Sequence, residues 1–316
     1  MSRFIILLVG LFTYPISANS WGFFAHKTIN HAAVYTLPTE MFGFYKANIA
    51  SITELAVQAD KRRYLLKDEA PRHYLDADYY ESVIPLDTIP RNYDSAIAWY
   101  GTDTLMAHGI VPWHVMRVKW WLTKAFIERD FTSIIKLSAD LGHYVGDLHV
   151  PLHTSHNYNG QYTGQRGIHG FWESRLPELF CDTYDLFTGK AVYIFNIENT
   201  IWSKFEESYS AVDSVLYLDK LSQDAIRDDH LYTFEQRGRQ TVRTQSKKYS
   251  SAYHNGLNNM VERRMRSSVL CVGSLWYTAW VDAGQPDLDL LTSNTLEPIK
   301  DSFPINGKFL GREEPN

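Results

Sequence analysis

The chain has 316 residues, of which 45% are hydrophobic, so it is long and apolar enough to bury a full core as one large domain or two small ones. Its 31 basic and 36 acidic residues give a net charge of −5, which does not suggest a dedicated nucleic-acid binder but leaves room for a local basic cleft. The only cysteines are Cys181 and Cys271, which excludes a disulfide framework. One bridge is possible in an oxidising compartment, but the sequence does not show that the two thiols meet.

The first twenty residues have the order of regions found in a secretory signal peptide. Arg3 precedes an apolar run over residues 4–16, and a small-residue Ala-x-Ser site ends at Ser20. The run is shorter than the roughly 20 apolar residues that a membrane span needs, and no other stretch is apolar enough. A buried N-terminal helix is the alternative, but Arg3 and the small-residue site favour export. We therefore predict that residues 1–20 are a signal peptide cleaved before Trp21, that the protein is periplasmic or secreted, and that it has no transmembrane segment.

Apolar residues recur at helical spacing along most of the remaining chain, and the alternation typical of strands is nearly absent. The predicted helices, in chain order, cover residues 21–37, 51–59, 94–107, 112–129, 131–149, 169–180, 198–218 and about 235–281. Prolines and polar residues predict loops at 84–92 and 157–167, and Gly284-Gln285-Pro286 ends the last helix. Since no repeat or linker interrupts the pattern, the sequence predicts an all-α fold, a single-domain multi-helix bundle over residues 21–284 followed by a polar tail at 285–316.

The helix predicted over residues 131–149 carries the first pair of candidate metal ligands. His143 and Asp147 are four residues apart, so their side chains share one helix face. Pro151 ends this helix, because it lacks an N–H and restricts the residue before it. His153 therefore lies just beyond the helix end, close to the first pair.

A second pair with the same spacing follows at His169 and Glu173. Imidazole and carboxylate together are a ligand set for zinc. A single pair of this kind more often reflects a hydrogen bond or a solvated face, but two pairs with a histidine at the first helix end favour a metal site. His149 is a surplus histidine in this segment, and we predict that it packs or supports a ligand.

Further candidates lie nearer the N-terminus. If Trp21 is the first residue of the mature protein, its free α-amine and carbonyl could chelate a metal, and His26 lies on the first turns of the helix that follows. Asp60 precedes the basic run Lys61-Arg62-Arg63, which is either a solvated face or a place where Asp60 points at a metal and one arginine reaches a bound phosphate. His73, taken alone, is typical of a structural histidine.

Set together, the candidates follow a characteristic order: Trp21, His26, Asp60, His73, His143, Asp147, His153, His169 and Glu173. Their order and types resemble the trinuclear-zinc superfamily of bacterial zinc-dependent phospholipases C and P1/S1-type nucleases, in which a mature N-terminal Trp chelates through its backbone. The matching segment covers about half of the chain. The resemblance implies an all-α bundle of the phospholipase C/P1 nuclease type that binds three Zn²⁺ ions.

The resemblance also implies a role for each position. It assigns one zinc to Asp60, His73, His143 and Asp147, and a second zinc to His153, His169 and Glu173. It assigns a third zinc to the Trp21 amine and carbonyl, His26 and the other oxygen of Asp147. The predicted catalytic residues are Asp60, which would orient or deprotonate the attacking water, and Arg63, which would contact the phosphate.

The spacing of the ligands combines features of both branches of this superfamily. The short interval from His153 to His169 and the terminal Glu173 resemble the phospholipase branch, whereas the short interval from Trp21 to His26 resembles the nuclease branch. We expect a secreted zinc-dependent phosphodiester hydrolase that cleaves phospholipids as a phospholipase C does, with transient contact at a membrane surface. A single-strand nuclease or 3′-nucleotidase of the P1/S1 type is the second hypothesis. The third is a non-catalytic exported zinc-binding protein, against which the full ligand set argues. The oligomeric state stays open.

Overall fold

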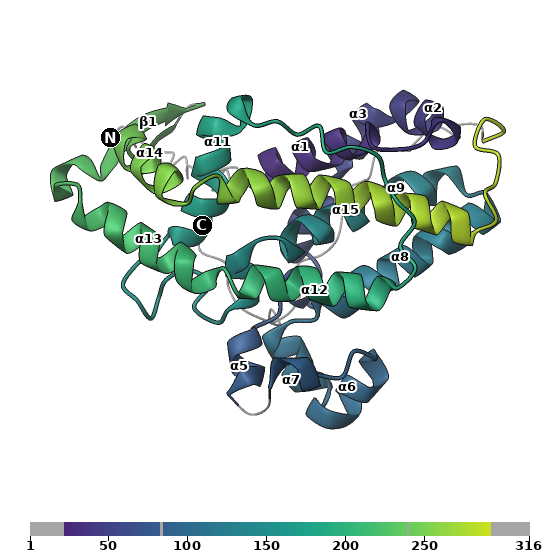
Figure 1. The fold of residues 1–316 in the computed structure, drawn as a ribbon, viewed down its shortest axis with the longest axis horizontal. Helices are drawn as coiled ribbons and strands as arrows, with labels where there is room; N and C mark the ends of the chain where they lie inside the picture. Colours follow the sequence, from purple (N-terminus) through teal and green to yellow (C-terminus); the bar gives the residue numbers. More distant parts are fainter. Residues whose placement is uncertain (1–21, 83–84, 239, 292–316) are drawn as a thin grey trace, which may run out of the picture.

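The computed structural model describes residues 22–82, 85–238 and 240–291, and most of them are helical (Figure 1). The longer helices are α1 (Gly22–Val34), α8 (Val111–Glu128), α9 (Phe131–Leu148), α12 (Ile197–Tyr209), α13 (Val212–Asp224) and α15 (Met260–Asp282). The shorter helices are α2 (Thr39–Ala47), α3 (Ile49–Leu55), α4 (Gln58–Arg63), α5 (Ala77–Glu81), α6 (Tyr93–Tyr100), α7 (Thr102–His108), α10 (Ile168–Gly170), α11 (Leu176–Phe180) and α14 (Lys247–Gly256). The predicted all-α fold class is confirmed for the described residues.

Helix α9 forms the centre of the molecule. Its first turn is capped by Asp130, whose side chain accepts a hydrogen bond from the Ser133 backbone N–H at 3.1 Å. From Ser138 onward α9 is buried on nearly all sides, because it packs against α1, α3, α8 and α15. Polar side chains within this buried stretch need partners, since burying an unpaired polar group is costly. His143 and Asp147 lie within it.

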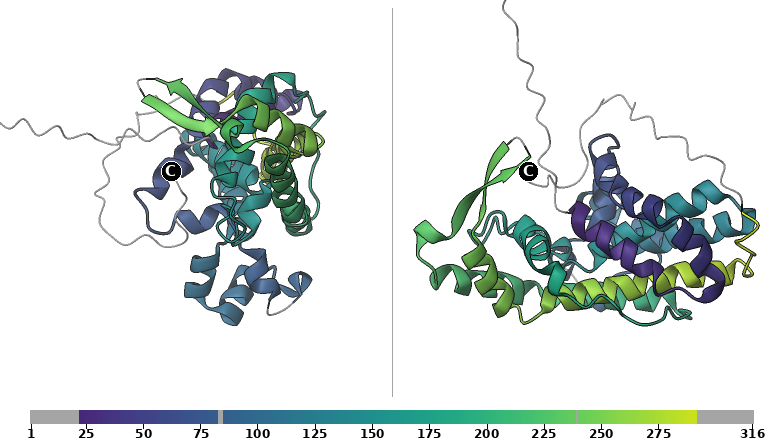
Figure 2. Two further views of the ribbon diagram at one scale, coloured as in Figure 1. Left: turned by 90° about the vertical axis from the view of Figure 1, so that its left-hand side faces the viewer. Right: turned by 90° about the horizontal axis from the view of Figure 1, so that it is seen from above.

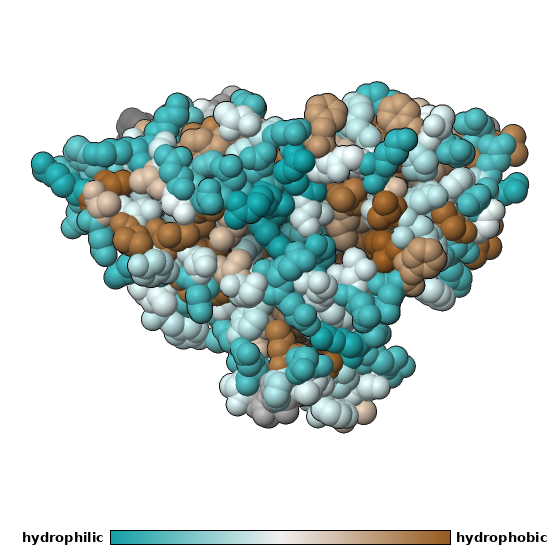
Figure 3. All heavy atoms as spheres, viewed as in Figure 1, coloured by the Kyte–Doolittle hydropathy of each residue, from teal (hydrophilic) through white to brown (hydrophobic). Residues whose placement is uncertain are grey.

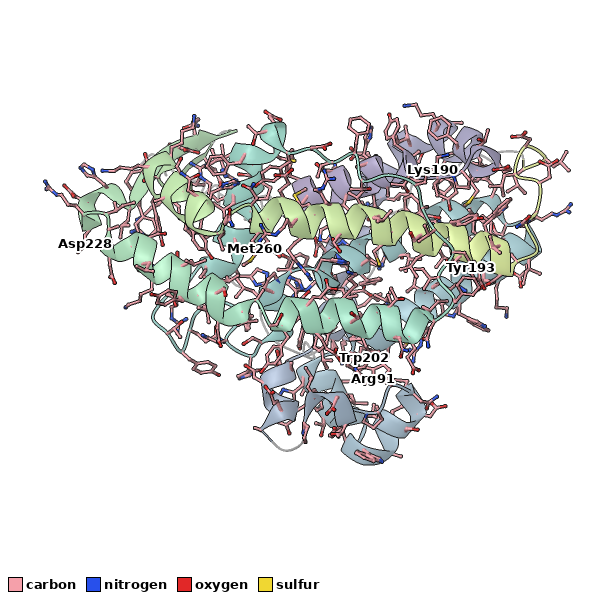
Figure 4. The ribbon with its side chains drawn as sticks, in the orientation of Figure 1. Arg91, Lys190, Tyr193, Trp202, Asp228 and Met260 are labelled. Carbon is pink, nitrogen blue, oxygen red and sulfur yellow. The ribbon has the colours of Figure 1, made fainter. Side chains whose placement is uncertain are left out.

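The remaining helices surround this core. Helix α15 crosses the face seen in Figure 1, with α12 and α13 in a row beneath it and the short helices α5, α6 and α7 in a small lobe below. Arg91, in the lobe, joins it to α12 (Figure 4): its guanidinium lies over the Trp202 ring, 4.0 Å from the centroid, and pairs with Glu206 at 2.7 Å. Hydrophilic side chains cover the middle of this face, and hydrophobic ones gather in separate patches toward its left and right sides (Figure 3).

One stretch predicted as helical is a β-hairpin. Strands β1 (Tyr232–Arg237) and β2 (Gln240–Gln245) pair antiparallel, with Phe234 opposite Arg243. Their aromatic and β-branched residues suit a strand, and Gly238 adopts the positive φ of 61° that the turn requires. The hairpin projects from the helical body (Figure 2). The helix predicted from about residue 235 is therefore wrong at its start, and the remainder forms α14 and α15.

Other boundaries also differ from the prediction. The helix expected over 198–218 is divided between α12 and α13, and the one expected over 51–59 between α3 and α4. Cys181 and Cys271 are free thiols. Within the described ranges, no helix combines the length and apolar character needed to span a membrane. The predicted signal peptide, Trp21 and residues 292–316 of the predicted tail lie outside the described residues.

Candidate metal centre

The predicted ligands come from separate elements that converge on α9. They are His26 in α1, Asp60 in α4, His73 at the end of the short 3₁₀ helix η1 (Ala70–His73), His143 and Asp147 in α9, His153 in η3 (Pro151–Thr154), His169 in α10, and Glu173 in the π-helical turn η4 (Phe171–Arg175). All of these are buried except Asp60, whose side chain is 16% exposed. The structure thus brings together every predicted ligand except Trp21, which lies outside the described residues.

The first group consists of Asp60, His73, His143 and Asp147. Asp147 Oδ2 lies 2.9 Å from His73 Nδ1 and 3.2 Å from His143 Nε2, and these two nitrogens are 3.1 Å apart. Asp60 Oδ1 lies 3.9 Å from His73 Nδ1 and 3.7 Å from His143 Nε2. Four donor atoms from three elements therefore point toward one small volume.

These separations fit a tetrahedral zinc ion. Zinc bonds of about 2.0–2.1 Å to nitrogen and oxygen place the ligand atoms of a tetrahedron about 3.3 Å apart, and the oxygens of Asp147 and Asp60 lie 2.9 to 3.9 Å from the nitrogens of His73 and His143. His143 Nδ1 lies 2.8 Å from the Ala56 carbonyl oxygen, to which it can donate, so that Nε2 is left as the metal-binding nitrogen. The side chains of the first group therefore fit a zinc ion in number, type and spacing.

The electrostatics of the first group also favour a cation. Burial alone would lower the pKa of His143, but the negative charges of Asp147 and Asp60 outweigh it and raise the pKa to about 9. Burial would raise the pKa of Asp147, but His143, His153 and His26 hold it well below its usual range. In the metal-free chain, a proton on His143 therefore offsets part of the negative charge of Asp147 and Asp60. A bound metal ion would replace that proton.

The second group consists of His153, His169 and Glu173. Each carboxylate oxygen of Glu173 faces one histidine, with Oε2 at 3.1 Å from His153 Nε2 and Oε1 at 3.1 Å from His169 Nε2. His153 Nδ1 lies 2.7 Å from the His73 carbonyl oxygen, which leaves Nε2 toward the group. Burial would raise the pKa of Glu173, but His169 and His153 outweigh it and lower the pKa to about 2. These side chains could hold a second ion.

His26 defines a possible third position on the other side of Asp147. His26 Nε2 lies 3.2 Å from Asp147 Oδ1, whereas Asp147 Oδ2 faces the first group. The two oxygens of one carboxylate are therefore turned toward different sets of nitrogens, which is the geometry of a bridging ligand. Among the described residues this third position has fewer donors than the first, and Trp21 is the predicted source of the others.

A buried carboxylate outside the predicted ligand set lies beside His73. Glu69 is fully buried, and its Oε1 lies 3.8 Å from His73 Nε2. Arg62 and Arg72 pair with it at 3.3 and 2.6 Å. Burial would raise the pKa of Glu69, but these arginines and His73 outweigh it and lower the pKa. The signal in the sequence is the four-residue spacing of Glu69 and His73, the same spacing as in the two ligand pairs.

The two arginines of the basic run after Asp60 have different surroundings. Arg62 is held by Asp140 at 3.0 Å in addition to Glu69, so it belongs to the packing around α9. Arg63, the predicted phosphate contact, is half-buried at the end of α4. Burial lowers the pKa of the His73 ring, and the charge of Arg63 adds to this effect. His149, predicted to pack or support, has its Nδ1 2.8 Å from the Val145 carbonyl oxygen, and its own carbonyl oxygen accepts a hydrogen bond from Arg264.

A small pocket with a volume of about 30 Å³ adjoins the candidate centre and is partly open to solvent. His26 and Glu173 belong both to its wall and to the candidate ligand set. Most of the rest of the lining is apolar: Ala25, Ile29, Gly146, Val150, Trp172, Val261 and Met265. Its polar members are His149, Arg264 and Ser268. The candidate metal centre therefore borders a largely apolar cavity, formed where α1, α9 and α15 meet.

Comparisons with known proteins give structural matches alone. No family model and no curated protein matches the chain. The fold is similar to that of the alpha-toxin of Clostridium perfringens isolated from avian strain SWCP, with 12% identity, a TM-score of 0.49, and coverage of 85% of this chain and 66% of that chain. It is also similar to the alpha toxin of Clostridium absonum, with 14% identity, a TM-score of 0.43, and coverage of 81% and 65%. This chain thus spans just under two thirds of the length of either toxin. The chemistry of the site follows from its own residues.

Proposed function

We propose that this protein is a zinc-dependent phosphodiester hydrolase that cleaves phospholipids on the glycerol side of the phosphate, as a phospholipase C does. The observation that carries the proposal is the convergence on α9 of two groups of imidazole and carboxylate donors, with His26 on the other side of Asp147, beside a largely apolar pocket. A zinc ion that only stabilises the fold would need one closed set of ligands and no adjoining cavity. We further infer that three zinc ions bind, through the ligands that the sequence resemblance assigns.

Different residues of the chain would have different roles in the reaction. When bound, zinc would supply Lewis acidity and lower the pKa of water to about 7. Asp60 turns Oδ1 toward His73 and His143, while its Oδ2 is buried with no hydrogen-bond partner among the described residues. That oxygen is available to accept the proton of an attacking water. Attack would form a new bond from the water oxygen to phosphorus, and the glycerol oxygen would leave with a proton.

The remaining residues would bind and orient the substrate. Arg63, next to His73, supplies a positive charge that suits a phosphodiester, and we assign it contact with the phosphate. The apolar wall formed by Ile29, Val150 and Met265 suits the hydrocarbon next to a lipid phosphate better than the sugar and bases next to a nucleic-acid phosphate. We therefore infer a phospholipid substrate and transient contact with a membrane surface.

The experiment compares three substrates on the purified chain from Trp21 onward, with zinc added. Phosphatidylcholine vesicles, single-stranded DNA and 3′-AMP separate the lipase, nuclease and nucleotidase functions. Diacylglycerol and a phosphorylated head group are the expected products, and Asp60→Asn should reduce their formation to near background. Cleavage of DNA or 3′-AMP in preference to the lipid would replace this proposal by the nuclease branch. Absence of turnover on all three substrates, with zinc bound, would favour a structural role.

A further inference from the structure

A second set of histidines and a carboxylate lies outside the candidate metal centre. Asp76, His108 and His156 come from the start of α5, the end of α7 and the segment after η3. Asp76 Oδ2 is 3.3 Å from His108 Nδ1 and 3.3 Å from His156 Nδ1. None of these residues belongs to the ligand set assigned above, and the proposed hydrolysis uses none of them.

The carboxylate of Asp76 is directed toward the two imidazoles. Asp76 is the N-cap residue of α5, a position where an aspartate normally accepts a hydrogen bond from the first turn, yet its side chain makes no capping bond. It is 1% exposed. Burying a carboxylate is costly unless positive charge or hydrogen-bond donors surround it. The side chain has therefore exchanged helix capping for contact with His108 and His156.

The surrounding backbone holds the cluster in place. The Asp76 N–H donates to the His108 carbonyl oxygen at 2.8 Å, and an isolated β-bridge joins the adjacent residues Leu75 and Gly109. Gly109 has a φ of 90°, and a Cβ there would lie 2.0 Å from the Tyr74 carbonyl oxygen, so the close approach of the two segments requires glycine.

The two rings are also fixed from outside the cluster. The His108 ring stacks on Tyr79, with centroids 3.5 Å apart, and the His156 ring stacks on Tyr162. The His156 backbone N–H donates to the Asp78 carboxylate at 2.9 Å. The donors are thus oriented in advance, which lowers the entropic cost of binding a ligand between them.

We propose that Asp76, His108 and His156 form an additional binding site for a first-row divalent transition-metal ion such as Zn²⁺. Two imidazoles and one carboxylate are a ligand set that selects zinc, cobalt or nickel over magnesium or calcium. The two separations of 3.3 Å from Asp76 Oδ2 to the histidine nitrogens equal the ligand spacing of about 3.3 Å around a tetrahedral zinc. All three ligand atoms lie within 4.8 Å of one another.

The site is open to solvent on one side. The side chain of His156 is 48% exposed, so an ion can enter, and a fourth position remains for water. The three ligands belong to segments far apart in the chain, so a bound ion would tie α5 and α7 of the small lobe to the segment that follows η3. Binding to the folded state alone also raises the unfolding temperature as metal is added.

The test counts metal ions on the full chain in the parent protein and in His156→Gln. His108→Gln is a second variant, and His230→Gln is the control, because His230 is also about half exposed and lies 3.7 Å from an aspartate, Asp229. After equilibrium dialysis against micromolar Zn²⁺, elemental analysis gives ions per chain, and a parallel Co²⁺ titration reports ligand type by absorption. Near-ultraviolet circular dichroism checks folding of each variant.

We expect each cluster variant to bind one ion fewer than the parent, and the control to bind as many as the parent. Equal ion counts in the parent and His156→Gln would overturn the proposal, as would loss of an ion in the His230 control. The readout is a difference between matched proteins and needs no enzymatic turnover. Failure of the proposed hydrolysis would therefore leave this result unaffected, and a full catalytic centre could coexist with a negative result here.

Discussion

Gly146 lets the ring of His26 lie directly against α9. A Cβ at Gly146 would be 2.7 Å from His26 Nδ1 and 2.9 Å from its Cε1, closer than a side chain tolerates. This close approach brings His26 Nε2 to 3.2 Å from Asp147 Oδ1. The absent side chain of one residue therefore sets the position of a candidate ligand on another helix.

Gly146→Ala should separate metal binding from stability. Alanine is favoured over glycine within a helix by about 1 kcal/mol, and this gain in helix stability offsets destabilisation of the fold by the added methyl group. The added methyl displaces His26, and we expect the affinity for one zinc to fall by about 10–100-fold, the range found when the support of a metal ligand is lost. Zinc titration and thermal unfolding of the same samples check this.

The matched control is Gly43→Ala in α2, where an added Cβ meets nothing within 4 Å. It should keep the full zinc content. If Gly146→Ala also keeps parental affinity at every zinc, then His26 is not a ligand.

Asp147→Asn should cost more than one metal ion. Its two oxygens face different nitrogens, His26 on one side and His73 on the other, so replacing one oxygen by an amide nitrogen weakens two positions at once. Glu173→Gln lies in the second group and should mainly empty one position. Elemental analysis after zinc reconstitution measures both variants, and loss of a single ion in each would contradict the bridging role of Asp147.

Glu69 should make the metal-free protein sensitive to acid. Its pKa is lowered in the folded state, because the charges of Arg62, His73 and Arg72 outweigh the effect of burial. The folded state then binds fewer protons than the unfolded state, so this contribution to stability is present above the unfolded pKa of about 4.3 and is lost as the pH falls through the folded value.

Urea unfolding of the metal-free protein between pH 3 and pH 7 tests this contribution. In Glu69→Gln the free energy of unfolding should fall less steeply toward acid than in the parent, because the glutamine has no proton to take up. Glu40→Gln, at an exposed position in the first turn of α2, is the control and should keep the parental slope. Identical slopes for the parent and Glu69→Gln would show that Glu69 does not cause the loss of stability in acid.

We expect the third metal position to be filled only when Trp21 is the first residue of the mature protein. Indole is a poor zinc ligand, so Trp21 would act through its α-amine and carbonyl, which form a five-membered chelate only when Trp21 is the first residue. A free amine has a pKa of about 7.7–8.0 and is readily deprotonated by a metal at neutral pH. Protein with one extra residue before Trp21 should bind fewer zinc ions and turn over slowly.

Trp21→Phe with the same N-terminus is the control, because it keeps the amine and carbonyl. It should retain the metal and lose mainly packing. Zinc content and rate are compared at equal folding. If the protein with the one-residue extension has the parental zinc content and the parental rate, Trp21 is not a ligand.

Helix geometry made part of the site predictable from the sequence. His143 and Asp147 had to share a face once α9 was a helix, and Pro151 had to end it before His153. Spacing alone could not show that Asp60 and His73 approach this pair, since that contact depends on how α4 and η1 pack on α9. Their inclusion came from the resemblance of the whole ordered set to a known family.

Other features gave a weaker local signal. Glu69 stands in the charged run Lys67-Asp68-Glu69, which is typical of a solvated turn, yet it is fully buried because arginines from both sides pair with it. The hairpin was missed because its strands are short and directly precede a helix. The cluster of Asp76, His108 and His156 has no periodic spacing, so only the packing of the lobe reveals it.

The backbone links the two donor groups in a way that bears on how the protein acquires its ions. His73, from the first group, accepts a hydrogen bond on its carbonyl oxygen from the His153 ring of the second group, and the His153 carbonyl accepts one from Leu75 N–H at 3.0 Å. Ordering either group therefore orders the other before its own ion arrives. Loading should be cooperative, with empty and full chains outnumbering partly loaded ones during a zinc titration followed by native mass spectrometry. A limited supply of zinc would then give fewer but fully loaded molecules.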